Sequence, residues 1–159
     1  MPVLDKDAHK GGILIVDPRK FVVVKTIEVA DCFPQGLAKG PGTNWILGCS
    51  AGSKHSTLPP KIAVFDAKTE KIVAATDKMG GADAAAYDSK YGIYVMGGRE
   101  APGGPSVGVI DAKTNAWIEN ISLPPNPHSV AVDPSTGYVL VPSGMTGGVC
   151  SGCVVVLGK

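Results

Sequence analysis

The stretch Lys61–Asp77, KIAVFDAKTEKIVAATD, has a residue pattern that occurs more than once in this chain. A Val/Ile-rich run ends at an aspartate, a short Ala-Lys-Thr turn follows, and a second β-rich run leaves the turn. The same order recurs at Val107–Ile121, VGVIDAKTNAWIENI, and more loosely at Ile13–Ile27, ILIVDPRKFVVVKTI. The turn aspartates lie 49 and 45 residues apart, at Asp17, Asp66 and Asp111. A period of about 40 to 50 residues built from short strands predicts the blades of a β-propeller.

Alignment on the turn aspartates places the other strands of each unit. We expect an all-β fold of about three four-stranded blades, because every apolar run is short and bounded by turn residues. The chain is read as one repeat domain, 1–159, with units near 13–60, 61–106 and 107–152 and a terminal strand at 153–157. The expected strands are 13–16, 21–29, 45–48, 62–65, 71–76, 93–96, 107–110, 117–121, 138–141 and 153–157, with short apolar strands at 37–38, 84–86 and 130–132.

The turns have a mechanical explanation. An aspartate before Ala-Lys-Thr or Pro accepts hydrogen bonds from backbone amides two residues on and closes a hairpin. We therefore interpret the repeated aspartates as turn residues rather than as metal ligands. Asn44, Gly92 and Gly137 stand at one equivalent place in a second turn, where a positive φ is expected. The turn-rich joint between units reads Phe33–Gly36 in its first copy.

Composition excludes several classes of protein. Charged residues make up 18% of the 159 residues, and the formal net charge is +1, so a strongly basic nucleic-acid binder is not the expected reading. The 21 glycines and 13 prolines indicate turns and long loops, since 44% of the residues are hydrophobic. No apolar run is long enough for a membrane span, and the first ten residues contain no signal-peptide core.

The four cysteines leave alternatives open. Cys150 and Cys153 form a C-x-x-C, and Cys32 and Cys49 stand apart from them. A single C-x-x-C cannot complete a four-thiolate zinc site, so we expect no structural zinc there. Disulfides, plain buried thiols and a metal or redox site all remain open, and a bridge between Cys32 and Cys49 is conceivable because they flank one expected hairpin. With disulfides, the protein would be periplasmic or secreted.

The strand count raises the question of ring closure. If a unit is written as strands A to D from the centre outwards, the expected strands begin and end at C, giving three A, three B, four C and three D strands. Closed propellers need about four to eight blades. We therefore expect a homo-oligomer, two copies forming a six-bladed ring about a two-fold axis, or the missing half of a longer propeller. The start of the chain resembles the middle of a gene, and its end resembles a natural end.

The residues that enter the innermost strand are the main candidates for chemistry, because these positions line the funnel of a propeller. Gln35, Asp83 and His128 are equivalent there. Three long loops are expected at the same face, Cys49–Pro60, Gly97–Pro105 and Pro142–Gly152, and they add His55, Arg99 and Glu100. His128 and Asp83 suit a hydrogen-bonded structural pair, a general base with its orienting carboxylate, or two ligands of a divalent metal.

The pattern V-x-V-x-D-x-x-T, then a strand, then P-x-G/S-x-A resembles the YVTN-type β-propeller repeat. The Lys61 copy has Ala82 in place of the proline, and the Ile13 copy lacks the threonine. The resemblance covers about nine tenths of the chain and implies architecture more than function. That group includes surface-layer and periplasmic proteins, lactonase-like enzymes and relatives of dehydrogenase subunits, and no enzyme motif of theirs matches here. The best copy is Val107–Val141, which carries Asp111, Thr114, Pro127, Val130, Ala131, Asp133, Gly137 and Tyr138.

Two functions follow as expectations. The first is a non-catalytic propeller that binds a ligand or partner at its loop face and funnel, through Gln35, His55, Asp83, Glu100 and His128. The second is a funnel-site enzyme, a lactonase-like hydrolase or a lyase, that uses His128 and Asp83 with Arg99 as a clamp for a carboxylate or oxyanion. Either reading allows a divalent metal at His128 and Asp83, and the sequence does not decide whether the protein is an enzyme.

Overall fold

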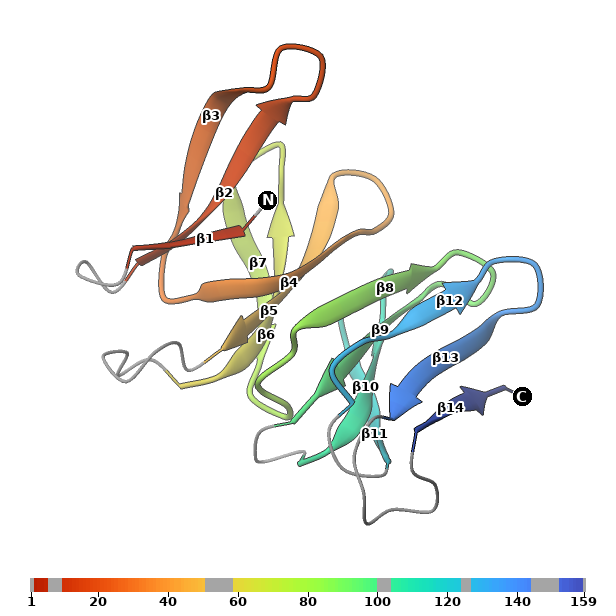
Figure 1. Ribbon diagram of the computed structural model, residues 1–159. Coiled ribbons are helices and arrows are strands. Elements are labelled where there is room, and N and C mark those ends of the chain that lie inside the picture. Colours follow the sequence, from red (N-terminus) through yellow and green to blue (C-terminus); the bar gives the residue numbers. More distant parts are fainter. Residues whose placement is uncertain are drawn as a thin grey trace.

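A computed structural model describes residues 2–5, 10–50, 59–99, 104–123, 127–143 and 152–158, with backbone alone at 2–5 and 10. These residues form fourteen β-strands and no helix (Figure 1). None of them is therefore part of a helix that could cross a membrane. The strands are β1 Pro2–Asp5, β2 Lys10–Asp17, β3 Val22–Val29, β4 Phe33–Lys39, β5 Asn44–Ser50, β6 Lys61–Asp66, β7 Lys71–Thr76, β8 Ala84–Asp88, β9 Ile93–Gly98, β10 Ser106–Asp111, β11 Trp117–Ser122, β12 Ala131–Asp133, β13 Tyr138–Ser143 and β14 Cys153–Leu157.

The strands form four sheets, and their order follows the chain within each sheet. β4–β7 and β8–β11 are four-stranded, whereas β1–β3 and β12–β14 have three strands each. Every strand pairing among the described residues is antiparallel. The innermost strands follow one another around the centre, since β4 contacts both β1 and β8, and β8 contacts β12. Figure 1 shows the result, an open arc of propeller blades, which confirms the expected fold class.

Two local features differ from the expectation. β1 was not predicted; it pairs with β2, from Pro2↔Ile13 to Asp5↔Lys10, so the described residues contain four B strands and not three. A strand of four residues is too short to carry a period, and its existence depends on its neighbour. In addition, β4 begins at Phe33, where a turn was expected. Pro34 is tolerated in this strand because β4 pairs with β5 alone, and the register shifts between Pro34 and Gly36.

One turn recurs five times. An aspartate side-chain oxygen accepts a hydrogen bond from the amide two residues on, at 2.8 to 3.0 Å. The amide four residues on donates to the aspartate's own carbonyl, and that fourth residue has a positive φ. The expectation for Asn44 was wrong: Gly42 has the positive φ there, because Asn44 closes a different turn with Gly40 and Pro41. The five pairs are Asp17 and Phe21, Asp66 and Glu70, Asp88 and Gly92, Asp111 and Asn115, and Asp133 and Gly137.

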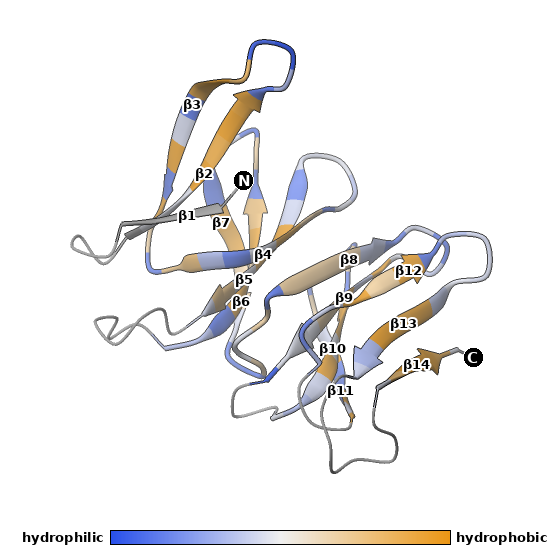
Figure 2. Cartoon of the chain, viewed as in Figure 1, coloured by the Kyte–Doolittle hydropathy of each residue, from blue (hydrophilic) through white to orange (hydrophobic). Residues whose placement is uncertain are grey.

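The core lies between the sheets rather than inside any of them. Three clusters of buried side chains fill the three spaces between neighbouring sheets. Ile13 and Phe65 belong to the first cluster, Ile62 and Met79 to the second, and Val139 to the third. Among the described residues, the outer faces of the two terminal sheets have no such neighbour. Apolar residues stay exposed on both terminal sheets, and Figure 2 shows orange strands at both ends of the arc.

Candidate functional site

The candidate residues come together at one edge of the arc, where the outer strand of one sheet leads to the inner strand of the next. Asp83 immediately precedes β8, Arg99 immediately follows β9, and His128 lies three residues before β12. The sheet β8–β11, together with the connections that lead into it and out of it, therefore supplies the three side chains.

Glycines at the ends of the B strands allow this approach. A Cβ atom at Gly97 would lie 2.7 Å from the carbonyl oxygen of Pro127, the residue before His128. A Cβ atom at Gly48 would lie 2.1 Å from the carbonyl oxygen of Ala82, the residue before Asp83. Real Cβ atoms do not come this close to backbone, so both connections can cross the strand ends only over glycine. Sequence reasoning missed these positions, although the Gly97-Gly98 pair at a strand end is a visible signal.

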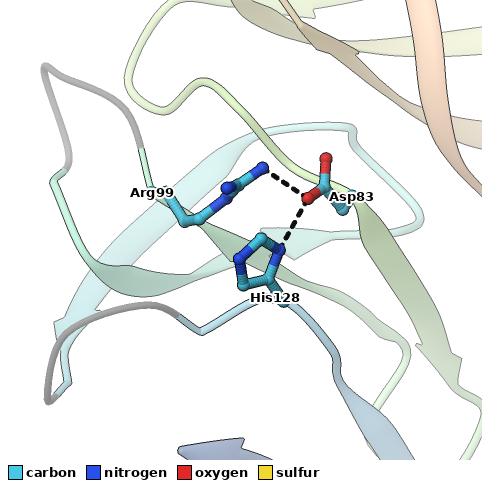
Figure 3. A network of polar contacts seen from close by, with 3 residues as sticks. All are labelled: Asp83, Arg99 and His128. Atoms are coloured by element: carbon cyan, nitrogen blue, oxygen red, sulfur yellow. Dashed lines mark hydrogen bonds and ion pairs between the residues drawn. The ribbon is translucent and has the colours of Figure 1, made fainter. Parts of the chain in front are cut away.

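The three side chains share one oxygen atom (Figure 3). Asp83 Oδ2 accepts a hydrogen bond from Arg99 Nη2 at 2.5 Å and lies 2.8 Å from Nδ1 of His128. A carboxylate only accepts hydrogen bonds, so Nδ1 carries the hydrogen and Nε2 is directed elsewhere. Within the described part of the chain, Nε2 has no hydrogen-bond partner. All three side chains are partly exposed, so a ligand can reach them from solvent.

The other candidates do not join this cluster. Gln35 lies exposed at the β4 bulge, and no hydrogen bond links it to Asp83 or His128. His55 and Glu100 lie outside the described residues. Equivalence in the repeat therefore brings together two of its three residues, and the loop adds Arg99.

The cluster fits a divalent metal poorly. Asp83 and His128 are only two ligands, and the described residues contain no group of three His, Cys, Asp or Glu side chains placed to hold an ion. Moreover, Arg99 places its positive charge on the oxygen atom that would bind the metal. The arrangement is better suited to an anionic group, because Arg99 has further N–H donors and His128 gains a second one when protonated.

Disulfides stabilise the same edge. Cys32 and Cys49 are joined, with a Cα–Cα distance of 5.0 Å, which is one of the pairings that the sequence leaves open. Both residues are buried, and the bridge ties the connection before β4 to the end of β5. Cys153 is also disulfide-bonded, whereas Cys150 lies outside the described residues.

Comparison with solved structures supports the architecture. A chain of hydrazine synthase from Kuenenia stuttgartiensis superposes with a TM-score of 0.73 and 14% identity, covering 99% of this chain and 42% of that one. A chain from the crystal structure of a mitotic checkpoint complex gives a TM-score of 0.65 and 15% identity, covering 86% and 42%. Both matched chains are β-propellers, and at this identity the likeness shows the fold alone.

This chain spans less than half the length of either matched structure. No protein-family model matches the sequence, and no curated protein matches it.

Proposed function

We propose that this chain is a propeller-type binding module that takes a carboxylate group of a ligand or partner at the edge formed by Asp83, Arg99 and His128. The observation that supports it is the shared oxygen: Asp83 Oδ2 contacts the Arg99 guanidinium and the His128 imidazole at once. One carboxylate thus fixes the orientation of a guanidinium and an imidazole without occupying all their donors. The remaining donors can bind a second carboxylate in a charge-assisted manner.

A titration with succinate tests the proposal. The chain has three histidines, so the imidazole signals of His128 can be assigned in an NMR spectrum by comparison with His128→Gln. We expect succinate to shift these signals in a saturable way and Arg99→Gln to weaken binding at least tenfold. Arg19→Gln is the matched control, because Arg19 is the other arginine and lies in an exposed turn. Equal loss in both arginine variants, or no shift, would contradict the proposal.

A funnel-site hydrolase is the second candidate. The specific observation is the 2.8 Å contact between Nδ1 of His128 and Asp83, which leaves Nε2 able to accept a proton. In lactone hydrolysis, Nε2 would take a proton from the attacking water and return it to the ring oxygen as the acyl C–O bond breaks. Arg99 would stabilise the negative charge that forms on the carbonyl oxygen. Turnover of a lactone panel that His128→Gln abolishes, with folding intact, supports this candidate, and no turnover excludes it for those substrates.

Kinship with the YVTN-type repeat is part of the proposal. It is supported by the best copy, in which the Thr114 hydroxyl donates to Asp111 at 2.8 Å and so fixes the D-x-x-T turn. The buried Cys32–Cys49 bridge supports a periplasmic or secreted location, since such bridges persist in oxidising compartments. Alkylation of free thiols in the native protein before and after reduction tests the location. Bridges that are reduced in freshly trapped protein would contradict it.

We also propose that the chain closes its ring with a second copy. The uncovered outer faces of β1–β3 and β12–β14 support this, because isologous contacts between them would bury both faces and end further growth. With four sheets in each chain, two copies would form a ring of eight sheets rather than the six counted from sequence. The missing half of a longer propeller would meet the same need, and the mass of the isolated chain in solution distinguishes the two.

A further inference from the structure

Two neighbouring grooves of the arc are filled to very different extents. Between β1–β3 and β4–β7, a cavity of about 460 Å³ lies against Phe65 and Glu70. In the next groove, between β4–β7 and β8–β11, the repeat places Ile110 and Asn115 at these positions, and the cavity beside them has only about 10 Å³. Described residues form both walls of each groove, so side chains of this chain set the difference.

Two large side chains fill the second groove. Trp117 and Met79 belong to its apolar core, and an added Cβ at Gly108 of β10 would lie 2.6 Å from the Trp117 ring and 3.0 Å from the Met79 methyl group. At the equivalent positions of the first groove stand the smaller Ile72 and Ala30. The first groove therefore lacks the volume of an indole and a thioether side chain.

A hydrogen bond also closes the second groove. Asn120 of β11 donates from Nδ2 to the carbonyl oxygen of Lys78 at 3.0 Å, which joins the two sheets across the groove. The equivalent residues of the first groove are Ala75 and Val29, and the side chain of Ala75 has no donor. The first groove therefore has neither the filling side chains nor this bridge.

The open groove has charges that the filled groove lacks. Asp31, just after β3, lies on one wall of the cavity, and Lys61 and Lys71 of β6 and β7 lie on the other. Within the described part of the chain, none of these three residues forms an ion pair with another. Opposite charges are thus held apart on the two walls. The equivalent residues of the filled groove are uncharged: Gly80, Ser106 and Ala116.

The remaining lining residues fit this division of the cavity. Glu28 adds a second carboxylate to the wall that carries Asp31, whereas Glu70 is held by an ion pair with Lys25. Phe65 is buried and forms an apolar floor between the two walls. A ligand that matches this cavity carries a negative group at one end, a positive group at the other and an apolar body.

We propose that this groove binds a free amino acid with a large apolar side chain. The side chain occupies the space that Trp117 and Met79 fill in the next groove, and it packs on Phe65. The carboxylate of the amino acid pairs with Lys61 and Lys71, and its ammonium group pairs with Asp31, in charge-assisted hydrogen bonds. The site is separate from the Asp83 cluster, since no residue of that cluster lines the cavity.

Calorimetric titration of the full chain with L-tryptophan tests the proposal. We expect saturable binding, and at least tenfold weaker binding of tryptamine, which lacks the carboxylate, and of indole-3-propionate, which lacks the ammonium group. Lys61→Ser with Lys71→Ala introduces the residues of the filled groove and should remove the preference for tryptophan over tryptamine. Asp31→Asn should remove the preference over indole-3-propionate. Lys68→Ala is the matched control, because Lys68 lies in the exposed turn between β6 and β7 and does not line the cavity.

A second variant fills the cavity without changing a charge. Ala30→Met with Ile72→Trp introduces the side chains that the next groove already accommodates, and it should weaken tryptophan binding at least tenfold with the β-sheet circular dichroism retained. The response of His128 to succinate should stay unchanged in this variant, so failure at one site is distinguishable from failure at the other. If the filled variant does not fold, the lysine and aspartate variants decide.

Three results would overturn the proposal. The first is that neither L-tryptophan nor L-methionine binds saturably. The second is that binding survives in a folded variant with the filled groove. The third is that Lys68→Ala weakens binding as much as the change at Lys61 and Lys71, because the lysines would then act only through the general charge of the surface.

Discussion

Phe21 illustrates how the recurrent turn constrains single residues. It has a φ of 54° in the left-handed region, and its side chain is 87% exposed. The left-handed conformation costs a residue with a side chain roughly 1–2 kcal/mol, and the extra backbone entropy of glycine offsets about half of that. We therefore expect Phe21→Gly to raise the free energy of unfolding by roughly 0.5–1 kcal/mol in urea denaturation.

Gly137→Ala is the reverse experiment at the same turn position. Gly137 has a φ of 73°, and an added Cβ would lie 2.3 Å from the Tyr91 ring. This variant should therefore lose at least about 1 kcal/mol of stability. If Phe21→Gly were as destabilising as Gly137→Ala, the turn would not be the common element described here.

The turn carboxylates make stability depend on pH. Hydrogen bonds from Thr43 and from the Lys68 amide lower the pKa of Asp66 to about 2, and bonds from Ser135 and Thr136 lower that of Asp133 to about 2. The unfolded values are near 3.9, so the carboxylates contribute stability above that pH, and this stability is lost as the pH falls toward 2. In Asp66→Asn and Asp133→Asn, which cannot ionise, we expect a smaller loss of stability between pH 6 and pH 2.5. Parallel acid unfolding curves for variants and wild type would contradict this.

The sequence predicts only part of the candidate site, for a physical reason. Asp83 and His128 could be predicted, because the repeat places both at the entrance to an inner strand. Gln35 has the same register, but the bulge between Pro34 and Gly36 alters the local geometry, and the repeat does not reveal a bulge. The contact of Arg99 with Asp83 depends on the path of a loop, which no periodicity specifies.

At the scale of elements, the predictable strands are those whose neighbours have the same pattern. The C and D strands alternate around a common aspartate turn, so their positions followed from the sequence. β1 has no such signal, because pairing with β2 is what makes it a strand.

The glycines at the blade edges give a graded prediction. An added Cβ would lie 2.1 Å from the carbonyl oxygen of Ala82 at Gly48, 2.7 Å from that of Pro127 at Gly97, and 3.0 Å from that of Ala82 at Gly36. Backbone cannot yield as a flexible side chain can, so the loss of stability on substitution by alanine should follow the order Gly48, Gly97, Gly36, within roughly 1–3 kcal/mol. Chemical denaturation measures the order.

Substitution of these glycines should also disturb the histidine of the candidate site. Gly97→Ala should shift the imidazole resonances of His128, because Pro127 precedes it, whereas Gly137→Ala, whose added Cβ meets the Tyr91 ring, should leave them in place. A reversed order of stabilities, or an equal shift in both variants, would argue that the glycines do not position the site.

At the scale of the whole molecule, the core leaves the outer faces of the two terminal sheets uncovered. Each space between sheets is filled by apolar residues contributed from both sides. The terminal sheets, in contrast, expose Val22, Val23 and Val24 at one end, and Val154 and Val156, 56% and 53% exposed, at the other. We therefore expect further propeller sheets, from a second copy or from a longer polypeptide, to pack against both terminal faces.

Closure by a second copy makes a prediction that mass measurement can decide. Two seams that each bury several hundred Å² of apolar surface would contribute on the order of 20 kcal/mol at roughly 25 cal/mol per Å². This exceeds the roughly 4–15 kcal/mol that association costs in lost freedom, so a stable dimer is expected at micromolar concentration. Sedimentation equilibrium should then give twice the mass of one chain.

Val154→Lys with Val156→Lys should shift the protein toward monomer with its β-sheet circular dichroism retained, whereas Val73→Lys, on an outer strand away from the seams, should not. A wild-type protein that stays monomeric and soluble would show that the outer faces tolerate water, and the ring would have to be closed by a different polypeptide.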